Sequence, residues 1–322
     1  MNWITRWKKI GIKVKQIFKS QPTGSEETSW ESCPQCKKIS YRPDLIDNSY
    51  ICECTFHFDL PPKLRLESLF DSTYKIIDSP ANINPDPLNF EVKSETKSYK
   101  YIDKIKKYRK ITGQETALLC ASGKMSGLDV VIVCFNPKFG AGRFGPAENE
   151  HFLEAANFAV QKKVDAWIVV YQSSGIDVHT GVTGLAGMTK SIIAMDLIKK
   201  AKIPTFAIAA RAVAGGTYAS SFFQHEFIII ESKCVENLLF SGKRVTSNIL
   251  KGTDQIPESF GTATGIMNAG LADITLESRK ELKETVVKLT TIILQKEDLK
   301  KQSVEEAHEN QKDFKKTAST TS

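Results

Sequence analysis

The chain has 322 residues, of which 41% are apolar and 25% are charged. That length and composition allow one large core, or a main domain with a small appendage, and argue against a disordered or fibrous protein. Lys and Arg outnumber Asp and Glu by 44 to 37, which gives a net charge of +7. This excess modestly favours a polyanionic partner, either nucleic acid or a phosphate-bearing ligand, without choosing between them.

Hydropathy and cysteine usage indicate where the protein works. No stretch reaches the roughly 18 uninterrupted apolar residues of a membrane-spanning helix, so we expect a soluble protein. No apolar signal-peptide segment stands at the N-terminus. Of the seven cysteines, four crowd between Cys33 and Cys54 and three are scattered, which is unlike a disulfide framework. These features favour a reducing compartment.

The first 20 residues carry six cations and no acid, with apolar residues at helical spacing. Two interpretations stay open: a short amphipathic helix for a membrane surface or organelle targeting, or a basic tail that docks on the protein itself or on a partner. Gly11 favours the tail, because glycine costs a helix about 1 kcal/mol. A polar linker over residues 21–30 follows.

Further along, prolines punctuate the chain after residue 60, which suggests a boundary there. We divide the chain into a basic segment with its linker (1–30), a cysteine module (31–60), a main domain (61–298) and a polar tail (299–322) that we expect to be disordered. Apolar runs of strand length alternate with helical patterns in the main domain, which predicts an α/β fold. The expected strands are 116–119, 130–135, 166–171, 205–209 and 227–230, and the expected helices are 99–110, 148–162, 184–200, 216–224 and 282–299.

The cysteine module carries two pairs, Cys33 with Cys36 and Cys52 with Cys54. Four thiolates can enclose a tetrahedral zinc ion at about 2.3 Å, and so short a segment can hardly fold without a metal. The second pair has one intervening residue instead of two, and His57 would restore the usual gap. We therefore predict a zinc site of Cys33, Cys36 and two or three of the other ligands. The alternative is a set of reduced cysteines left from a lost site.

Three glycine-bearing turns each follow an expected strand: Gly140-Ala-Gly142-Arg-Phe-Gly145, Ser173-Ser-Gly175 and Ala214-Gly215-Gly216-Thr217. The first departs from the dinucleotide-binding spacing and lacks the acidic partner downstream, so we reject a Rossmann fold. Paired glycines between a strand and a helix let a ligand approach the backbone, and their amides can stabilise an oxyanion such as a thioester enolate. Any one turn could be an ordinary tight turn, but three at corresponding strand ends favour a site.

A nucleophilic enzyme is not indicated, because the chain has no Gly-x-Ser-x-Gly motif. The histidines His151, His179, His225 and His308 have no convincing carboxylate partner in sequence, and we expect them to be surface or packed residues. Asp177 and His179 lie beside the second turn. That proximity makes them a weak candidate pair.

Over residues 3–298 the chain resembles the β subunit of the carboxyltransferase of multi-subunit acetyl-CoA carboxylase. The features that carry the resemblance are short individually, but their shared order and spacing are specific. They are Trp3 with basic neighbours, Cys33-x-x-Cys36, Asp86-Pro-Leu-Asn-Phe90, residues 99–103, Lys110-Ile-Thr-Gly113, residues 139–145, Ser173-Ser-Gly175, Met188-Thr-Lys-Ser191, Ile203-Pro204, Gly215-Gly216 with Ala219-Ser220, Phe240-Ser-Gly-Lys-Arg-Val245 and residues 270–273.

The resemblance implies a crotonase-like (ClpP/crotonase) α/β core behind a small zinc ribbon. It implies transfer of a carboxyl group from carboxybiotin, on the biotin carboxyl carrier protein, to acetyl-CoA, giving malonyl-CoA for fatty acid biosynthesis. By the same resemblance Gly215 and Gly216 are catalytic, as backbone N–H donors to one of the two reacting carbonyls, that of the thioester or that of biotin's ureido ring, with a matching pair from the α subunit. No side-chain base is needed, because biotin's ureido nitrogen can take the proton. The implied substrate-binding residues are Gly140, Gly142, Gly145, Gly175, Gly242 and Arg244.

The implied partners are an α subunit, in an α2β2 heterotetramer that shares the active site, together with the biotin carrier and biotin carboxylase. ATP binding is a further implication. No membrane partner is implied, and nucleic acid is not expected. The implied location is the cytoplasm, or the plastid stroma in a host that has plastids.

The chain departs from the family pattern in its turns. Where the family usually reads Ser-Gly-Gly-Ala-Arg, this chain has Ser174-Gly-Ile-Asp-Val178, and Ala141, Arg143 and Pro146 alter the first turn. Lys243 stands where the family has proline. Three interpretations follow: a working β subunit, a non-catalytic subunit that keeps the fold and the partner surface, or a zinc-ribbon nucleic-acid-binding protein. For the last, Tyr41 with Arg42 and Tyr50 are the weak signal.

Overall fold

The computed structural model describes residues 29–93, 98–231, 233, 237–241, 243–249 and 256–295. The N-terminal segment with most of its linker, and the C-terminal tail, lie outside the described residues. The expectations of an amphipathic helix or basic tail at one end and of a polar tail at the other therefore stay predictions.

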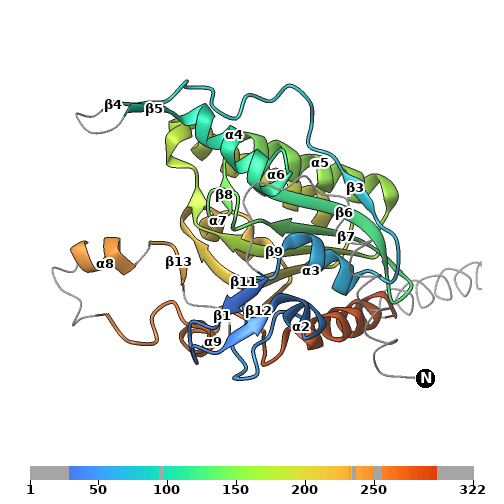
Figure 1. The fold of residues 1–322 in the computed structure, drawn as a ribbon. Coiled ribbons are helices and arrows are strands. Elements are labelled where there is room, and N and C mark those ends of the chain that lie inside the picture. Colours follow the sequence, from blue (N-terminus) through green and yellow to red (C-terminus); the bar gives the residue numbers. More distant parts are fainter. Residues whose placement is uncertain are drawn as a thin grey trace, which may run out of the picture.

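A mostly parallel sheet of eight strands forms the centre of the molecule (Figure 1). The strands follow one another across it in the order β14 (Ile274–Leu276), β12 (Phe227–Glu231), β11 (Thr205–Ala214), β9 (Ala166–Ser173), β7 (Leu128–Phe135), β6 (Leu118–Met125) and β3 (Lys75–Ile77), and β13 (Leu238–Leu239) also pairs with β11. The strands from β7 to β14 run parallel, whereas β6 and β3 are antiparallel to their neighbours. The expected α/β class is confirmed.

Helices cover both faces of this sheet, which explains why its strands read as unbroken apolar runs. All eight residues of β9 are buried. Two core clusters result, one on each face. The first includes residues from α5 (Pro146–Lys162) and α6 (Gly181–Lys200), and the second includes residues from α3 (Pro62–Leu69) and from a helix over residues 282–295 (Figure 1).

The five expected strands all form, but the first was predicted too short. It continues as β6 to Met125 and returns as β7 through a two-residue turn. Ser126 and Gly127 both have positive φ, +48° and +84°, as a type I′ hairpin turn requires. Gly123 and Lys124 hid this hairpin, because neither residue favours a strand.

Most expected helices form within a few residues of the predicted bounds, the first of them as α4 (Tyr101–Thr112). The helix expected over 216–224 was wrong in extent. The helix α7 (Gly215–Ala219) ends at Ser220, whose φ of −107° and ψ of −90° leave the helical region, and a 3₁₀ turn, Phe222–Gln224, follows. The last expected helix is described as far as residue 295.

The helix α6 and the 3₁₀ turn before it, Val178–Lys200, are long and apolar enough to cross a membrane by length and composition. A core helix of a soluble protein meets the same criterion. Here Lys190 and Asp196 interrupt the apolar residues, while Ala194, Met195 and Ile198 are buried in the core. About a third of the apolar window is buried, so α6 packs on the core along one face only.

The cysteine module contains β1 (Trp30–Ser32), β2 (Ile39–Tyr41) and α2 (Arg42–Asp47). Its own apolar cluster is small: Cys33, Leu45, Tyr50, Cys52, Phe58 and Leu60. Polar contacts attach it to the main domain. Arg279 donates to the backbone oxygen of Ser49 at 3.3 Å, and Asp59 forms an ion pair with Arg211. The remaining elements are β4 (Glu91–Lys93), β5 (Ser98–Lys100), β8 (Arg143–Phe144), β10 (Gly175–Ile176), α8 (Lys243–Ile249), α9 (Ala263–Asn268) and the 3₁₀ turns Val178–Thr180 and Arg279–Glu281.

Candidate active site and metal centre

The three glycine turns, residues 140–145, 173–175 and 214–217, lie together in the fold, and we call them the turn cluster. The hydroxyl of Ser173 joins all three: it donates to the backbone oxygen of Gly142 at 2.7 Å and lies 3.1 Å from the Thr217 hydroxyl. It also accepts from the Gly175 amide at 3.1 Å. Ser173 is fully buried, so its hydroxyl has a structural role.

Two glycines of the turn cluster are required by close backbone packing. A Cβ on Gly142 would lie 1.8 Å from the backbone oxygen of Gln172, and a Cβ on Gly175 would lie 2.7 Å from that of Ala214. Both glycines also have positive φ, +67° and +105°, which L side chains rarely adopt. The turns can therefore approach one another only because these positions have no side chain.

The two glycines of the third turn, Gly215 and Gly216, differ in the space that a side chain would have. Gly215 has a φ of +58°, and a Cβ there would have ordinary space, since its nearest neighbour would be the Gly175 Cα at 3.6 Å. A Cβ on Gly216 would lie 2.1 Å from Cγ1 of Ile176 and 3.0 Å from Sδ of Met188. The side chain of Ile176 therefore lies directly against Gly216.

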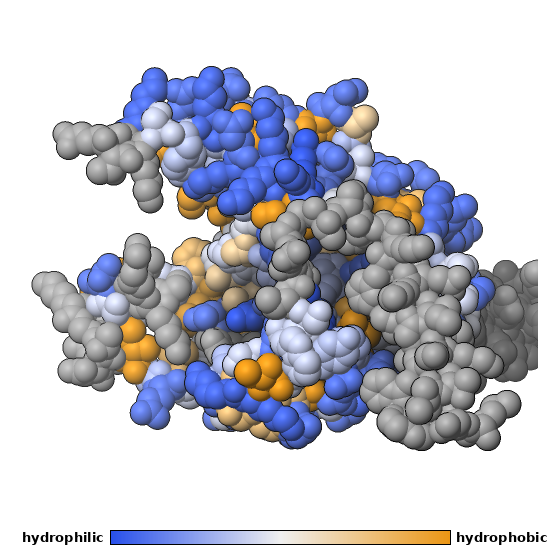
Figure 2. All heavy atoms as spheres, in the orientation of Figure 1, coloured by the Kyte–Doolittle hydropathy of each residue, from blue (hydrophilic) through white to orange (hydrophobic). Residues whose placement is uncertain are grey.

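The other expected substrate-binding residues are placed as follows. Gly140 and Gly145 flank Arg143: a Cβ on Gly145 would lie 2.4 Å from its Nη2, and one on Gly140 3.2 Å from its Cδ. Arg244 lies in α8, and only its backbone is described. Gly242 lies outside the described residues. Figure 2 shows a hollow on this face of the molecule, partly lined by apolar atoms, between the surface over α4 and β5 and the surface over α8.

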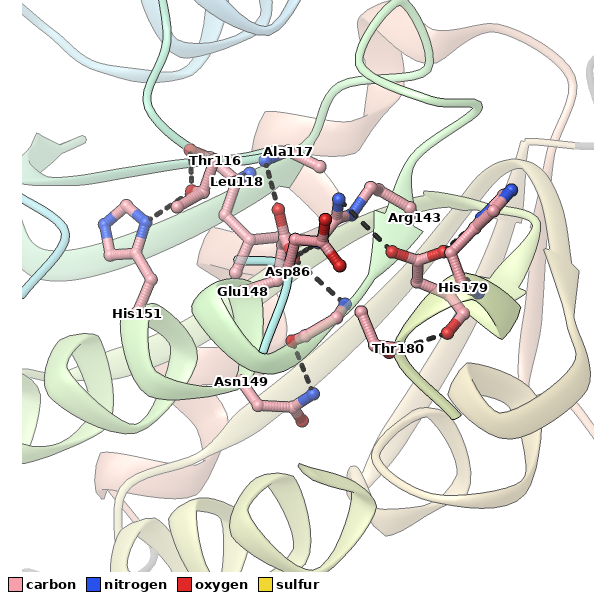
Figure 3. Close-up of polar contacts among 12 residues, drawn as sticks. Asp86, Thr116, Ala117, Leu118, Arg143, Glu148, Asn149, His151, His179 and Thr180 are labelled. Carbon is pink, nitrogen blue, oxygen red and sulfur yellow. Dashed lines mark hydrogen bonds and ion pairs between the residues drawn. The ribbon is translucent and has the colours of Figure 1, made fainter. Parts of the chain in front are cut away.

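A buried polar network, which includes Arg143 and Glu148, lies next to the turn cluster (Figure 3). The guanidinium of Arg143 contacts the Asp177 carboxylate at 3.2 Å and the Glu148 carboxylate at 3.1 Å. The hydroxyl of Tyr101 donates to Asp177 at 2.5 Å and accepts from Arg143 at 2.8 Å. The Gly145 amide donates to Glu148 at 3.0 Å. The network thus joins the first turn to the residues just after the second.

The carboxylates of this network act on the pKa values of Arg143 and Tyr101. Burial would lower the pKa of Arg143, but Glu148 and Asp177 outweigh it and raise that pKa. Burial raises the pKa of Tyr101, although Arg143 opposes the shift. The guanidinium therefore stays charged and the phenol stays protonated. The sequence did not predict the contact between Arg143 and Asp177, because no local pattern links these two residues.

One expectation about the histidines was wrong. His179 does have a carboxylate partner, since its Nδ1 lies 2.9 Å from Asp177 Oδ1, and its ring stacks on that of Tyr101 at 4.0 Å between centroids. The signal was the sequence proximity that we treated as weak. His151 and His225 are packed as expected, and both bond to backbone oxygens. His308 lies outside the described residues.

The four cysteines of the cysteine module form a group that could hold a metal ion. Their sulfur atoms all lie within 4.8 Å of one another, with Cys33 3.6 Å from Cys54 and Cys36 3.7 Å from Cys52. Four sulfurs at about 2.3 Å from a tetrahedral zinc ion are separated by about 3.8 Å. The donor set and its spacing therefore fit zinc.

The thiol pKa values are consistent with such a site. Burial would raise the pKa of Cys33, but the backbone amides of Cys36 and Gln35 lower it to about 7. Burial raises the pKa of Cys52 to about 12. A divalent cation at the centre would favour the thiolate form of all four.

The cysteine group does not include His57, which the sequence offered as a possible substitute ligand. Its side chain is buried, and burial together with Arg279 lowers its pKa to about 4. Cys52 and Cys54 can both face the centre of the group although only one residue separates them. Thr55 has a positive φ of +69°, and its amide donates to the Cys52 backbone oxygen at 2.8 Å. This tight turn brings both sulfurs to the centre.

Comparison with known proteins places these observations in a family. The model of the family described as "Carboxyl transferase domain" matches residues 95–321. The chain is similar to the acetyl-coenzyme A carboxylase carboxyl transferase subunit beta of Pelagibacter ubique, with 28% identity over 99% of this chain and 100% of that one. It is also similar to the protein of the same name from a Sulfurihydrogenibium species, with 32% identity over 86% of this chain and 95% of that one.

Two solved structures share the fold. One is a Pseudomonas malonate decarboxylase hetero-tetramer in complex with malonate, with a TM-score of 0.55 and 16% identity over 72% of this chain and 82% of that one. The other is transcarboxylase 12S with hydrolysed methylmalonyl-coenzyme A bound, with a TM-score of 0.54 and 18% identity over 72% of this chain and 41% of that one. The expected crotonase-like fold is confirmed, and the chain belongs to the carboxyl transferase domain family.

Proposed function

We propose that this chain is the β subunit of an acetyl-CoA carboxylase carboxyltransferase. In this role it helps to transfer a carboxyl group from carboxybiotin, on the biotin carboxyl carrier protein, to acetyl-CoA, which gives malonyl-CoA. One observation carries the proposal: relatives of that name align with 99% and 86% of this chain. The convergence of the three glycine turns supports it.

We assign the contact with a reacting carbonyl to the amides of Gly215 and Gly216. They are the first two residues of α7, where amides have no acceptor within the helix. Fixed amide donors stabilise the charge that develops on a thioester oxygen. Substrate binding is assigned to Gly140, Gly142, Gly145, Gly175, Gly242 and Arg244, and the first four lie in the turn cluster.

The chain's own part in the reaction is to bind and orient the thioester. Ser173 is held by the other turns, and Asp177 is paired with Arg143 and His179, so among the described residues these polar groups already have structural partners. Carboxybiotin would supply the carboxyl group and, at its ureido nitrogen, a base for the acetyl proton. The amides of Gly215 and Gly216 would hold one carbonyl in place.

We propose that the chain works with an α subunit, as an α2β2 heterotetramer served by the biotin carrier and biotin carboxylase. An apolar face on α6 supports a partner: Val182, Leu185, Ile192 and Ile193 are all exposed. Large contiguous apolar patches mark interaction surfaces. A protein of similar fold is itself a hetero-tetramer.

We further propose that the cysteine module holds a structural zinc ion through Cys33, Cys36, Cys52 and Cys54. Reduced, metal-binding thiols fit a cytoplasmic location, or the plastid stroma in a host that has plastids. ATP binding by the enzyme remains a prediction from family resemblance alone.

Reconstitution tests the function. The purified chain should be inactive alone and, when mixed with its α subunit, should catalyse malonyl-CoA-dependent carboxylation of biotin, the reverse reaction. Activity from the chain alone would contradict the shared site. An assembled complex without activity would favour the non-catalytic subunit. The nucleic-acid-binding alternative has lost one of its signals, since Tyr50 is buried in the module core.

A paired substitution tests the role of Gly216. Because Ile176 lies against this glycine, the test is made in the Ile176→Ala background, which opens space for an added Cβ. Adding Gly216→Val there keeps the amide N–H but places a branched side chain beside it. That side chain should hold the thioester away from the amides and lower kcat, relative to Ile176→Ala alone, by about the 100-fold to 1,000-fold that the loss of one oxyanion donor causes. Equal rates would show that the glycine pair is only a turn.

A further inference from the structure

Ile176 occupies a defined position between the third turn and α6. Its Cγ1 is the atom that a Cβ on Gly216 would meet at 2.1 Å, and its Cγ2 would lie 3.0 Å from a Cβ on Gly184. Sδ of Met188 would lie 3.0 Å from the same point above Gly216. Two apolar side chains therefore lie against Gly216 on the side where a Cβ would stand.

The orientation of Ile176 is fixed by its neighbours. Gly175 and Ile176 pair in register with Arg143 and Phe144. Successive side chains of an extended segment point to opposite sides, so Asp177 faces Arg143 while Ile176 faces Gly216. Ile176 also packs against the main core cluster, and a β-branched side chain has few alternative rotamers. The side chain is therefore held in place.

We infer that Ile176, with Met188 beside it, limits the size of the acyl group that the site accepts. This inference rests on the contact proposed between the Gly216 amide and the thioester carbonyl. A carbonyl oxygen bonded to this amide lies about 2.9 Å from the nitrogen, so the carbon next to the carbonyl comes within contact distance of whatever covers Gly216. A thioester without a branch at that carbon fits. One with an added methyl group meets Ile176.

The substrate class assigned by this geometry is an unbranched acyl-CoA, acetyl-CoA or malonyl-CoA, in preference to propionyl-CoA or methylmalonyl-CoA. One methyl group in an apolar pocket typically changes kcat/KM by about 10-fold to 200-fold. Truncating Ile176 should remove most of that preference.

The experiment uses the complex assembled with the α subunit. The ratio of kcat/KM for malonyl-CoA to that for methylmalonyl-CoA is measured in the reverse reaction for the wild type, Ile176→Ala and Ile176→Val. The control is Ile292→Ala, an exposed isoleucine on the helix over residues 282–295. We expect Ile176→Ala to lower the ratio at least 10-fold, Ile176→Val to lower it less, and the control to leave it unchanged.

The outcomes separate this inference from the proposed function. If the wild type is active and both Ile176 variants keep its ratio of kcat/KM values, the inference is overturned and the proposed function stands. This holds even if the rates with both thioesters rise together. If Ile176→Ala fails to assemble, the Ile176→Val ratio decides alone. A wild-type complex that is inactive with both thioesters refutes the proposed function, and activity gained only in Ile176→Ala would then identify Ile176 as an obstruction, not a selector.

Discussion

The turn cluster and the cysteine module are both small, but they are stabilised in different ways. The turn cluster sits at the ends of strands whose core clusters extend over both faces of the sheet. The cysteine module has one cluster of six buried residues and four sulfurs grouped around a common centre. The first region takes its geometry from a large neighbour, whereas the second has the small core that is typical of modules stabilised by the zinc ion proposed here.

Each region also borders a cluster of buried arginines and carboxylates. The two clusters differ in how the arginines share their carboxylates. Arg143 joins turns that are neighbours in space, and it has two carboxylates, Asp177 and Glu148. Beside the cysteine module, Arg65 and Arg279 share one carboxylate, Glu231, at 2.5 and 3.5 Å. Losing Glu231 removes a carboxylate from two buried arginines at once, whereas losing Asp177 removes one of the two carboxylates that contact Arg143, so the loss of Glu231 should cost more.

Removing the metal should have the largest effect. Zinc binding to small cysteine sites is worth about 10 to 16 kcal/mol, so a strong chelator should unfold residues 31–60 while the sheet stays folded. Metal analysis should give one zinc per chain before treatment, and hydrogen exchange should then rise in the module alone.

Single substitutions sharpen the same test. Cys52→Ser and Cys54→Ser should lose zinc equally, because both sulfurs belong to the group, and His57→Gln should keep it. A folded module that contains well under one zinc per chain would contradict the site.

The second largest effect concerns the shared carboxylate. Glu231→Ala leaves Arg65 and Arg279 buried without it, and breaking a buried pair costs about 3 to 5 kcal/mol. Urea unfolding should show a smaller loss for Asp177→Ala, because Arg143 keeps Glu148. Equal losses would mean that the two clusters do not differ as described.

A third prediction compares two glycines with the same φ of +67° in different surroundings. Gly113 has open space around it, so Gly113→Ala should cost only the backbone strain of a left-handed residue, about 1 to 2 kcal/mol. Gly142→Ala adds a clash with the Gln172 oxygen and should cost about 1 to 3 kcal/mol more. Similar losses in thermal unfolding would show that packing does not define the turn cluster.

The smallest expected effect is on the pH dependence of stability, through His225 in the main domain. Burial lowers the pKa of His225 to about 4, so the unfolded chain binds a proton that the folded chain rejects. Stability should therefore fall as pH drops from about 6.5 towards 4, by about 1 kcal/mol between pH 7 and 5.5 from this residue. His225→Asn removes the titration and should flatten the pH dependence of urea unfolding over that range. An unchanged slope would contradict the assignment.

Local patterns in the sequence predicted most of the sheet and the grouping of the four cysteines. Apolar runs such as residues 166–171 mark buried strands, and cysteine spacing marks a metal site without help from tertiary structure. Patterns could not reveal the contact between Ile176 and Gly216 or the pairing of Arg65 with Glu231, which are 166 residues apart. Such contacts depend on how strands order themselves in the sheet, which no local periodicity encodes.

The exposed apolar face of α6 has a consequence for how the protein is made in the cell. A chain synthesised in excess of its partner presents Val182, Leu185, Ile192 and Ile193 to water. Exposed surface of this kind is recognised by chaperones and proteases, and unassembled chains are removed. In the assembly with an α subunit proposed above, the scarcer subunit would then set the amount of enzyme, so balanced expression of the two subunits would matter more than strong expression of either.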